Sequence, residues 1–233
     1  MGSRLRRDAA PVLAGAISSD AAFIGNVQLA RKLGHALKLW DFWQPAPDDA
    51  TTQTAKLTRT VANGIKQIDF LDGIAGLDTQ AIQRRAATIT LASGADLRVL
   101  HPLDVLESRL QNLRLIAGKR NAGGIAQAHL SVGIARSFLL RLIEEAASTR
   151  VIFDAIERIG QIATNKRLTG VMLDYNLDVL SAVPAERIEQ SAFRTKRWPQ
   201  IMQAVEEQKR KYQKQRARRS RPSARSSPWM RMA

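Results

Sequence analysis

The spacing of apolar residues changes from strand-like to helix-like along the chain. Short β-type runs dominate the first half, whereas apolar residues recur every three or four positions in the second half. These patterns predict an α+β fold with a small mixed β-sheet followed by a helical bundle. We expect an α+β domain over residues 1–118, a helical domain over 119–215 and a basic disordered tail over 216–233.

Local signals predict the elements of the first half. The Asn26 side chain can cap a helix that runs to about Leu37, because it accepts hydrogen bonds from the first free N–H groups. The Pro-rich run Pro45–Asp49 predicts a loop, and two runs on either side of Asn63-Gly64 predict a hairpin. The expected strands are 20–25, 39–43, 56–62, 65–71, 88–91 and 97–100, with a short helix at 79–86.

A single acid, Asp69, lies inside the apolar run Ile68–Leu71. With a two-residue loop at Asn63-Gly64, Asp69 would lie opposite Thr58 and share its face with Lys56. Two interpretations are open for such an acid. It is either a solvated surface residue, with Lys56 as a cross-strand partner, or one ligand of a metal site.

The second half reads as successive helices. Pro102 suits the first position of a helix, and Asp104 would lie near the positive end of the helix dipole. Gly118 can end this helix. We interpret Gly123-Gly124 as a flexible link and not a phosphate-binding loop, because no Gly-Lys-Ser/Thr follows. Further helices are expected at 125–147, 151–163, 177–183 and 199–218.

Charge is concentrated at the C-terminal end of the chain. Residues 194–233 hold thirteen Lys or Arg and two acids, a net +11 of the +15 carried by all 233 residues. Such a tail either binds the phosphate backbone of RNA or another nucleic acid, or serves only to keep the protein in solution.

The residue content also excludes several classes of protein. There is no cysteine, hence no disulfide and no thiolate metal site, and the three histidines are far apart. The chain lacks an apolar run of about 18 residues and a secretory signal pattern. We therefore expect a cytoplasmic protein with no membrane partner.

Three segments together resemble the DNA polymerase β-like nucleotidyltransferase superfamily, in particular its abortive-infection toxin-type members. They are the run from Asp20 to Asn26, the strand Ile68–Leu71, and the strand, Pro-led turn and helix from Val99 to Arg109. The N-terminal Gly2-Ser3 pair is similar to the turn that precedes the first acid in this family. The likeness spans roughly residues 2 to 120 and rests on the order and spacing of these short motifs.

The resemblance implies a nucleotidyltransferase, which transfers a nucleoside monophosphate from an NTP to a hydroxyl acceptor with two Mg²⁺ ions. It implies that Asp20 and Asp69 are catalytic metal ligands. It further implies that Gly2 and Ser3 hold triphosphate oxygens through their backbone, and that Arg109 and Lys119 face the substrate phosphates. Arg109 stands where the family usually has lysine. An antitoxin-type protein partner is the corresponding expectation for the helical half.

The chain departs from the family pattern at one metal ligand. The family places a second acid two residues after the first, and here that residue is Ala22. The chain also begins at the Gly-Ser turn, so the resemblance implies a degenerate or N-terminally truncated member whose activity is in question. The alternative is a non-catalytic module that binds nucleic acid or an acidic partner through the basic tail. In that case Asp20 is a cap, and Arg109 is a solvated residue.

Overall fold

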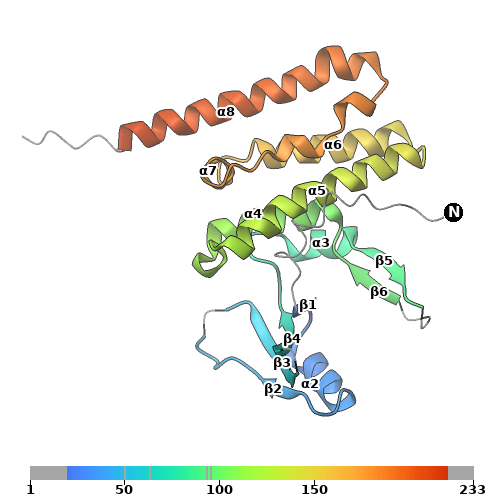
Figure 1. Ribbon diagram of the computed structural model, residues 1–233, viewed down its shortest axis with the longest axis vertical. Helices are drawn as coiled ribbons and strands as arrows, with labels where there is room; N and C mark the ends of the chain where they lie inside the picture. The colour runs from blue at the N-terminus through green and yellow to red at the C-terminus, as the bar shows by residue number, and fades with distance from the viewer. Residues whose placement is uncertain (1–19, 50, 63, 93, 95, 220–233) are drawn as a thin grey trace, which may run out of the picture.

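The computed structural model describes residues 20–219, apart from residues 50, 63, 93 and 95. Its architecture is mixed α+β, which confirms the coarse expectation from the sequence. A small four-stranded sheet lies at one end of the molecule, and the long last helix lies at the other (Figure 1). Gly2 and Ser3 lie outside the described residues.

The sheet is formed by strands β1 (Asp20–Ile24), β2 (Asp41–Trp43), β3 (Gln53–Val61) and β4 (Gly64–Leu71). Their order is β1-β4-β3-β2. β1 pairs with β4 in parallel, whereas the other two pairings are antiparallel. The parallel pairing needs a long crossover from β1 to β4, which runs through α2 (Val27–Ala36), β2 and β3.

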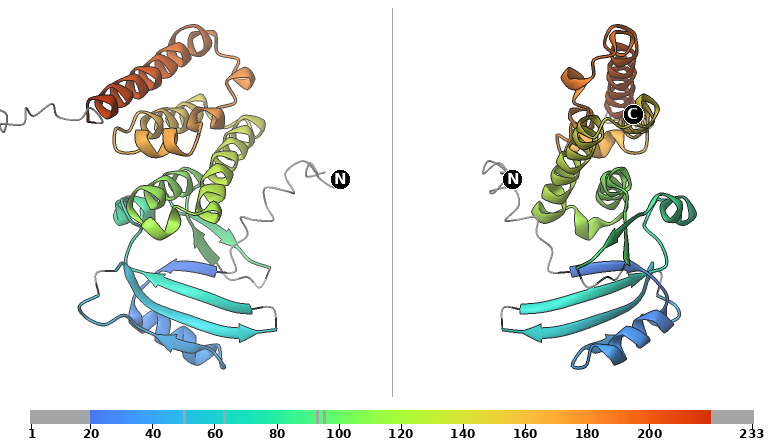
Figure 2. Two further views of the ribbon diagram at one scale, coloured as in Figure 1. Left: turned by 60° about the vertical axis from the view of Figure 1, so that its left-hand side comes forward. Right: turned by 90° about the vertical axis from the view of Figure 1, so that its right-hand side faces the viewer.

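Helix α2 covers one face of this sheet (Figure 2). As expected, its N-cap is Asn26, whose side chain accepts a hydrogen bond from the N–H of Leu29. The small core beneath it contains Ala30 of the helix and the buried strand residues Ala55, Leu57 and Phe70. Because side chains alternate along a strand, Asp69 lies on the opposite face, away from α2.

The hairpin forms between β3 and β4, but its register differs from the predicted one by two residues. Val61 pairs with Gly64, so Asp69 lies opposite Lys56 instead of Thr58. Gly64 itself has a φ of +124°, a conformation that favours glycine, and it serves as the first residue of β4. The shift is an even number, so every side chain stays on its predicted face.

A second layer connects the sheet to the helices. It contains the short helix α3 (Thr79–Arg85) and the hairpin of β5 (Ala87–Thr90) and β6 (Asp96–Val99). The helical part then comprises the following elements: α4 (Pro102–Leu115), a 3-10 turn η2 (Ala117–Lys119), α5 (Ala122–Glu144), α6 (Thr149–Ala163), α7 (Thr169–Asp174), 3-10 turns η3 (Val179–Ala182) and η4 (Ala185–Arg187), a π-helical turn η5 (Phe193–Arg197) and α8 (Trp198–Arg219).

Three boundaries differ from the sequence-based expectation. The larger core begins with Leu103 and includes the buried leucines of α4. Helix α4, which the sequence placed in the domain of residues 1–118, therefore packs with the helices that follow it. The glycines at 123 and 124 lie inside α5 and are not a link. Helix α8 continues to Arg219 and passes the tail boundary expected at 215/216, whereas residues 220–233 lie outside the described part.

Candidate functional site

Asp69 is half-buried on the face of the sheet opposite α2, and two glutamines hold its carboxylate. Gln67 Nε2 donates to both carboxylate oxygens, at 2.8 and 2.9 Å, and Gln53 Nε2 donates to Oδ1. Lys56, directly opposite in the ladder, places its ammonium 4.9 Å from the ring centre of Trp43. Neutral amides therefore surround Asp69, and the expected pairing with Lys56 is not the contact that forms.

The strand that carries the first predicted ligand runs beside β4. The Cα of Asp20 pairs with that of Gln67, and the Cα of Ala22 pairs with that of Asp69. The backbone thus brings β1 next to Asp69. The position directly across from Asp69, however, is an exposed alanine that offers no oxygen to a cation.

A cleft of about 700 Å³ lies between β1 and the layer formed by α3, β6 and the start of α4. Ala22 and Phe23 lie on its sheet side, and Ile82, Leu97 and Val105 lie on the other. Its two polar residues are Gln83 and Arg98, which are joined by a hydrogen bond from the guanidinium to the backbone carbonyl of Gln83. The described lining contains no carboxylate, so this cleft is mainly apolar.

The described side chains around Asp69 do not by themselves supply the ligands of a two-metal centre. Divalent cations such as Mg²⁺ require several oxygen ligands around each ion. Among the described side chains, which do not include that of Asp20, no three His, Asp or Glu come together in a group that could hold a metal ion. At Asp69, amide N–H groups already occupy both carboxylate oxygens, and Ala22 contributes no ligand.

The two basic residues predicted to face phosphates are placed differently from each other. Arg109 is half-buried on α4, and burial lowers the pKa of its guanidinium. It makes no hydrogen bond or ion pair with any other residue of the described part. Lys119 is exposed at the end of η2, after α4 has ended. A half-buried guanidinium without a partner is suited to an anion, and Arg109 is the better of the two candidates.

The most strongly organised charges involve Asp104, a residue that the sequence indicated only as a dipole-complementing acid. Its side chain is 0% exposed. Arg85 of α3 binds both of its oxygens, with Nη2–Oδ1 at 2.7 Å and Nε–Oδ2 at 3.1 Å, and Arg158 of α6 binds Oδ1 as well. Burial alone would raise the pKa of Asp104, but the two guanidiniums lower it below its usual value. Asp104 therefore ties three helices together.

No sequence signal could have identified Arg158 as a partner of Asp104, because 54 positions separate them. Arg158 also approaches Glu107 at 3.6 Å, and its Nη1 is buried without a hydrogen-bond partner among the described residues. His101, which caps α4 through Nδ1, lies edge-on to Phe138 at 4.8 Å between ring centres. Burial lowers the pKa of His101, and the positive charge of Arg158 adds to this effect. The cluster is a structural junction rather than a substrate site.

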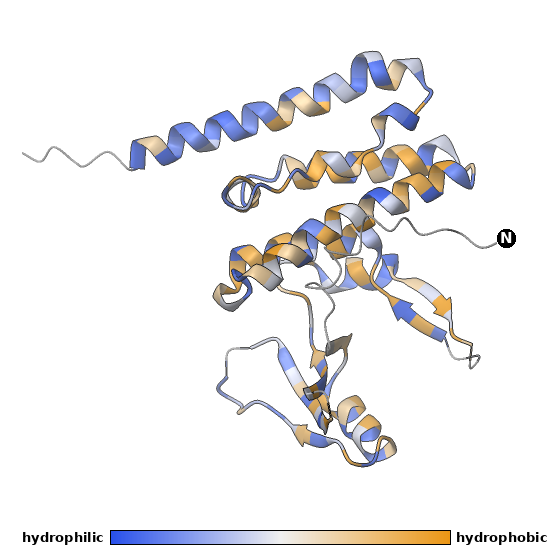
Figure 3. Ribbon diagram, in the orientation of Figure 1, coloured by the Kyte–Doolittle hydropathy of each residue, from blue (hydrophilic) through white to orange (hydrophobic). Residues whose placement is uncertain are grey.

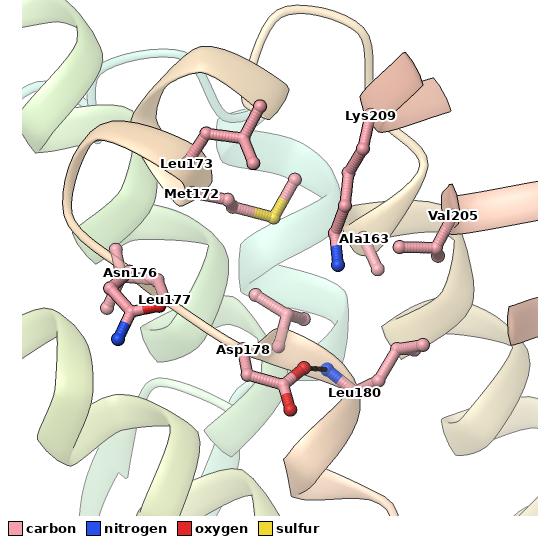
Figure 4. Close-up of a pocket in the computed structure, with 10 residues that line it drawn as sticks. Ala163, Met172, Leu173, Asn176, Leu177, Asp178, Leu180, Val205 and Lys209 are labelled. Atoms are coloured by element: carbon pink, nitrogen blue, oxygen red, sulfur yellow. Dashed lines mark hydrogen bonds between the residues drawn. The ribbon is translucent and has the colours of Figure 1, made fainter. Parts of the chain in front are cut away.

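A smaller pocket of about 100 Å³ lies where α8 meets α7 and the segment that follows it (Figure 4). Met172, Leu177 and Val205 give it apolar walls. Asp178 is occupied in accepting a hydrogen bond from the N–H of Leu180, and the Lys209 ammonium is 2.7 Å from Glu206. Ligand pockets usually measure about 300–1,000 Å³. This pocket is too small for a nucleotide. It lies in the packing interface between α8 and the helical part.

Comparison with known proteins adds no assignment. None of the described helices combines the length and apolar content needed to cross a membrane. No protein-family model matches the sequence, and no curated protein matches it.

Proposed function

We propose that this chain is a nucleotidyltransferase-like protein that has lost the two-metal transfer reaction. The observation that carries the proposal is the pairing of Ala22 with Asp69 on neighbouring parallel strands. An acid at position 22 would stand beside Asp69, which is the arrangement the family resemblance implies. An alanine at this one position removes the shared ligand and leaves the rest of the sheet intact.

The loss of one carboxylate has a clear chemical consequence. In this superfamily, two Mg²⁺ ions activate the attacking hydroxyl and neutralise the charge that develops on the leaving pyrophosphate. The described side chains do not by themselves supply the ligands of that pair of ions, so we assign no catalytic step to them. The side-chain amides of Gln53 and Gln67 instead donate hydrogen bonds to the carboxylate of Asp69. Binding of an NTP, with Arg109 and Lys119 toward its phosphates, belongs to the same proposal.

Replacing Ala22 with Asp is expected to create cation affinity. The new carboxylate would lie across from Asp69, and two adjacent carboxylates attract a divalent cation more strongly than one. We expect Mg²⁺ or Mn²⁺ to bind the Ala22→Asp variant at least about tenfold more tightly than the parent, roughly 1.4 kcal/mol. Calorimetry with Mg²⁺ and electron paramagnetic resonance with Mn²⁺ both measure this difference.

Ala21→Asp is the matched control. Ala21 is also exposed, but it pairs with Ile68 and so belongs to the opposite face of the sheet. Both variants add one negative charge, and only Ala22→Asp adds it beside Asp69. Equal cation affinity in the two variants would mean that net charge alone attracts the ion and that the assigned site is wrong.

A turnover assay tests the loss of activity separately. The parent chain, incubated with labelled NTP, Mg²⁺ and RNA or protein acceptors, is expected to incorporate no label. If the parent incorporates label and Asp69→Asn does not, the site is correctly assigned, but the proposed loss of activity is wrong. If the Asp20→Ala variant and the Asp69→Ala variant both still incorporate label, the assignment of the site to these residues is wrong.

A further inference from the structure

Helix α8 carries an exposed row of positive charge whose placement depends on how the helix packs. Three contacts define its inner side. Gln208 donates a hydrogen bond to Thr169 Oγ1 at 3.3 Å, Tyr212 lies against Gly170, and Arg216 pairs with Asp174 at 2.6 Å. Residues four positions apart lie on one side of a helix. Positions 208, 212 and 216 therefore face α7.

The positions halfway between these contacts face away from the protein. Two residues along an α-helix correspond to a rotation of about 200°, which is nearly the opposite side. Those positions are Arg210, Lys214 and Arg218, and Lys211 lies beside them one turn from Lys214. We call these four residues the outer basic row.

The outer basic row is free to bind a partner. All four side chains are exposed, and within the described residues none of them forms a hydrogen bond or an ion pair. No acid follows Glu207 in α8, and within the helix only Arg210 has an electrostatic interaction with an acid, Glu206, so most of the charge of the row is not offset. The second half of α8 is coloured almost entirely as hydrophilic in Figure 3, and its last turns extend beyond the other helices in Figures 1 and 2.

We infer that the outer basic row of α8 binds the phosphate backbone of nucleic acid. From Arg210 to Arg218 the row spans eight residues, about 12 Å at 1.5 Å per residue. A duplex presents one phosphate charge per roughly 1.7 Å of axis, so about seven charges lie along that length. Four aligned cations on a rigid helix can neutralise several phosphates at once, and phosphate contacts of this kind do not depend on base sequence.

Nucleic acid fits this surface better than an anionic membrane does. A helix that lies on a membrane needs an apolar face to bury among the lipid tails. The buried apolar residues of α8, Ile201 and Val205, face the protein, the exposed Met202 lies about two turns before the row, and Ala217 is the only aliphatic residue within the span of the row. The inference rests on α8 alone and does not depend on the site at Asp69 or on residues 220–233.

The test compares two fourfold variants of the full chain with equal net charge. The first variant carries Arg210→Gln, Lys211→Gln, Lys214→Gln and Arg218→Gln. The second variant, the control, carries Lys32→Gln, Lys38→Gln, Arg59→Gln and Lys66→Gln, all at exposed positions around the sheet. Glutamine is a good helix former, so α8 should persist, and circular dichroism checks this. The probes are labelled DNA and RNA duplexes of 20 base pairs, titrated from 50 to 200 mM salt.

The row variant is expected to bind both duplexes at least about tenfold more weakly at 50 mM salt. The slope of log affinity against log salt should become less steep by about 3.6, because four phosphate contacts contribute roughly 0.9 each. The control variant should behave as the parent does.

Three results would overturn the inference. Equal losses in both variants would show that binding follows net charge, and no loss in the row variant would assign binding to another part of the chain. Polyglutamate and vesicles containing phosphatidylserine are the two competing probes. Binding of either probe to the row as tightly as the duplexes bind would assign the row to an acidic protein or a membrane instead.

Discussion

Asp104→Asn is expected to lower the free energy of unfolding by about 3 kcal/mol, because removal of one member of a buried ion pair leaves an uncompensated charge. The Arg158 side chain is 19% exposed and would keep only the longer contact with Glu107 at 3.6 Å, whereas Arg85 is 39% exposed and can turn toward water. We therefore take the lower end of the range for buried pairs. For a chain of this size, the melting temperature should fall by about 6–12 °C in a thermal unfolding experiment.

The same carboxylate makes a defined contribution to the pH dependence of stability. The pKa of Asp104 is lower in the folded protein than its usual value. Its stabilising effect is then complete above the unfolded value of about 3.9 and is lost as the pH falls through the lower folded pKa. The stability difference between the parent and Asp104→Asn should therefore be constant from pH 5 to 7 and should shrink below about pH 4.

Glu107→Gln is the control for this prediction. Glu107 lies on the same helix and approaches the same guanidinium of Arg158, but at 3.6 Å, and its side chain is 21% exposed. We expect its removal to cost less than about 1 kcal/mol. A similar loss in both variants, or a loss below 1 kcal/mol in Asp104→Asn, would show that Asp104 does not hold the three helices together.

Local sequence signals were sufficient for most elements of the fold. Asn26 as a cap and Pro102 at the first position of α4 fix the starts of two helices, and both act through groups within one turn of their own position. The apolar periodicity likewise predicted α6 and α8 to within two residues of their observed starts. These features depend on neighbours in the chain, which a single sequence displays directly.

Features set by distant contacts could not be predicted in this way. A β-bulge between Gln53 and Ala55 brings Gln53 onto the face of Asp69, and no local signal indicates such an irregularity. Gly64, which tolerates a positive φ, is the first residue of β4, whereas the sequence predicted that Gly64 would be part of the loop. The short helix α7 was missed, because its six residues show too little periodicity to stand out.

The segment from His101 to Arg109 contains one residue with structural contacts, Asp104, and one residue with a proposed contact to phosphate, Arg109. Its resemblance to the nucleotidyltransferase pattern drew attention to Arg109, which has no partner within the described residues. Asp104, one turn earlier, is the residue with the strongest contacts, and these contacts are structural. A variant of Asp104 therefore tests the structural contacts, whereas the proposed phosphate contact is tested only by a variant of Arg109.

Gly124→Ala is expected to destabilise the protein by about 3 kcal/mol, because a side chain at this position has no space. A Cβ on Gly124 would lie 2.0 Å from the backbone carbonyl oxygen of Lys119. A backbone atom cannot move aside as a flexible side chain can. The turn that holds Lys119 is also fixed by Arg120, whose guanidinium donates to the carbonyl oxygens of Leu113 and Arg114 at 2.9 and 2.8 Å. Thermal unfolding measures the loss.

Gly123→Ala separates this steric effect from helix propensity. Both glycines lie in the first turn of α5, and a Cβ on Gly123 would meet its nearest atom, Asn121 Oδ1, at an ordinary 3.5 Å. Alanine favours a helix over glycine by up to about 1 kcal/mol, so Gly123→Ala should be neutral or stabilising. Trypsin should also cleave after Lys119 or Arg120 faster in Gly124→Ala than in Gly123→Ala, because only the former displaces the turn. If both variants were equally stable, the close approach of α5 to η2 would not exist, and the two glycines would be the flexible link that the sequence suggested.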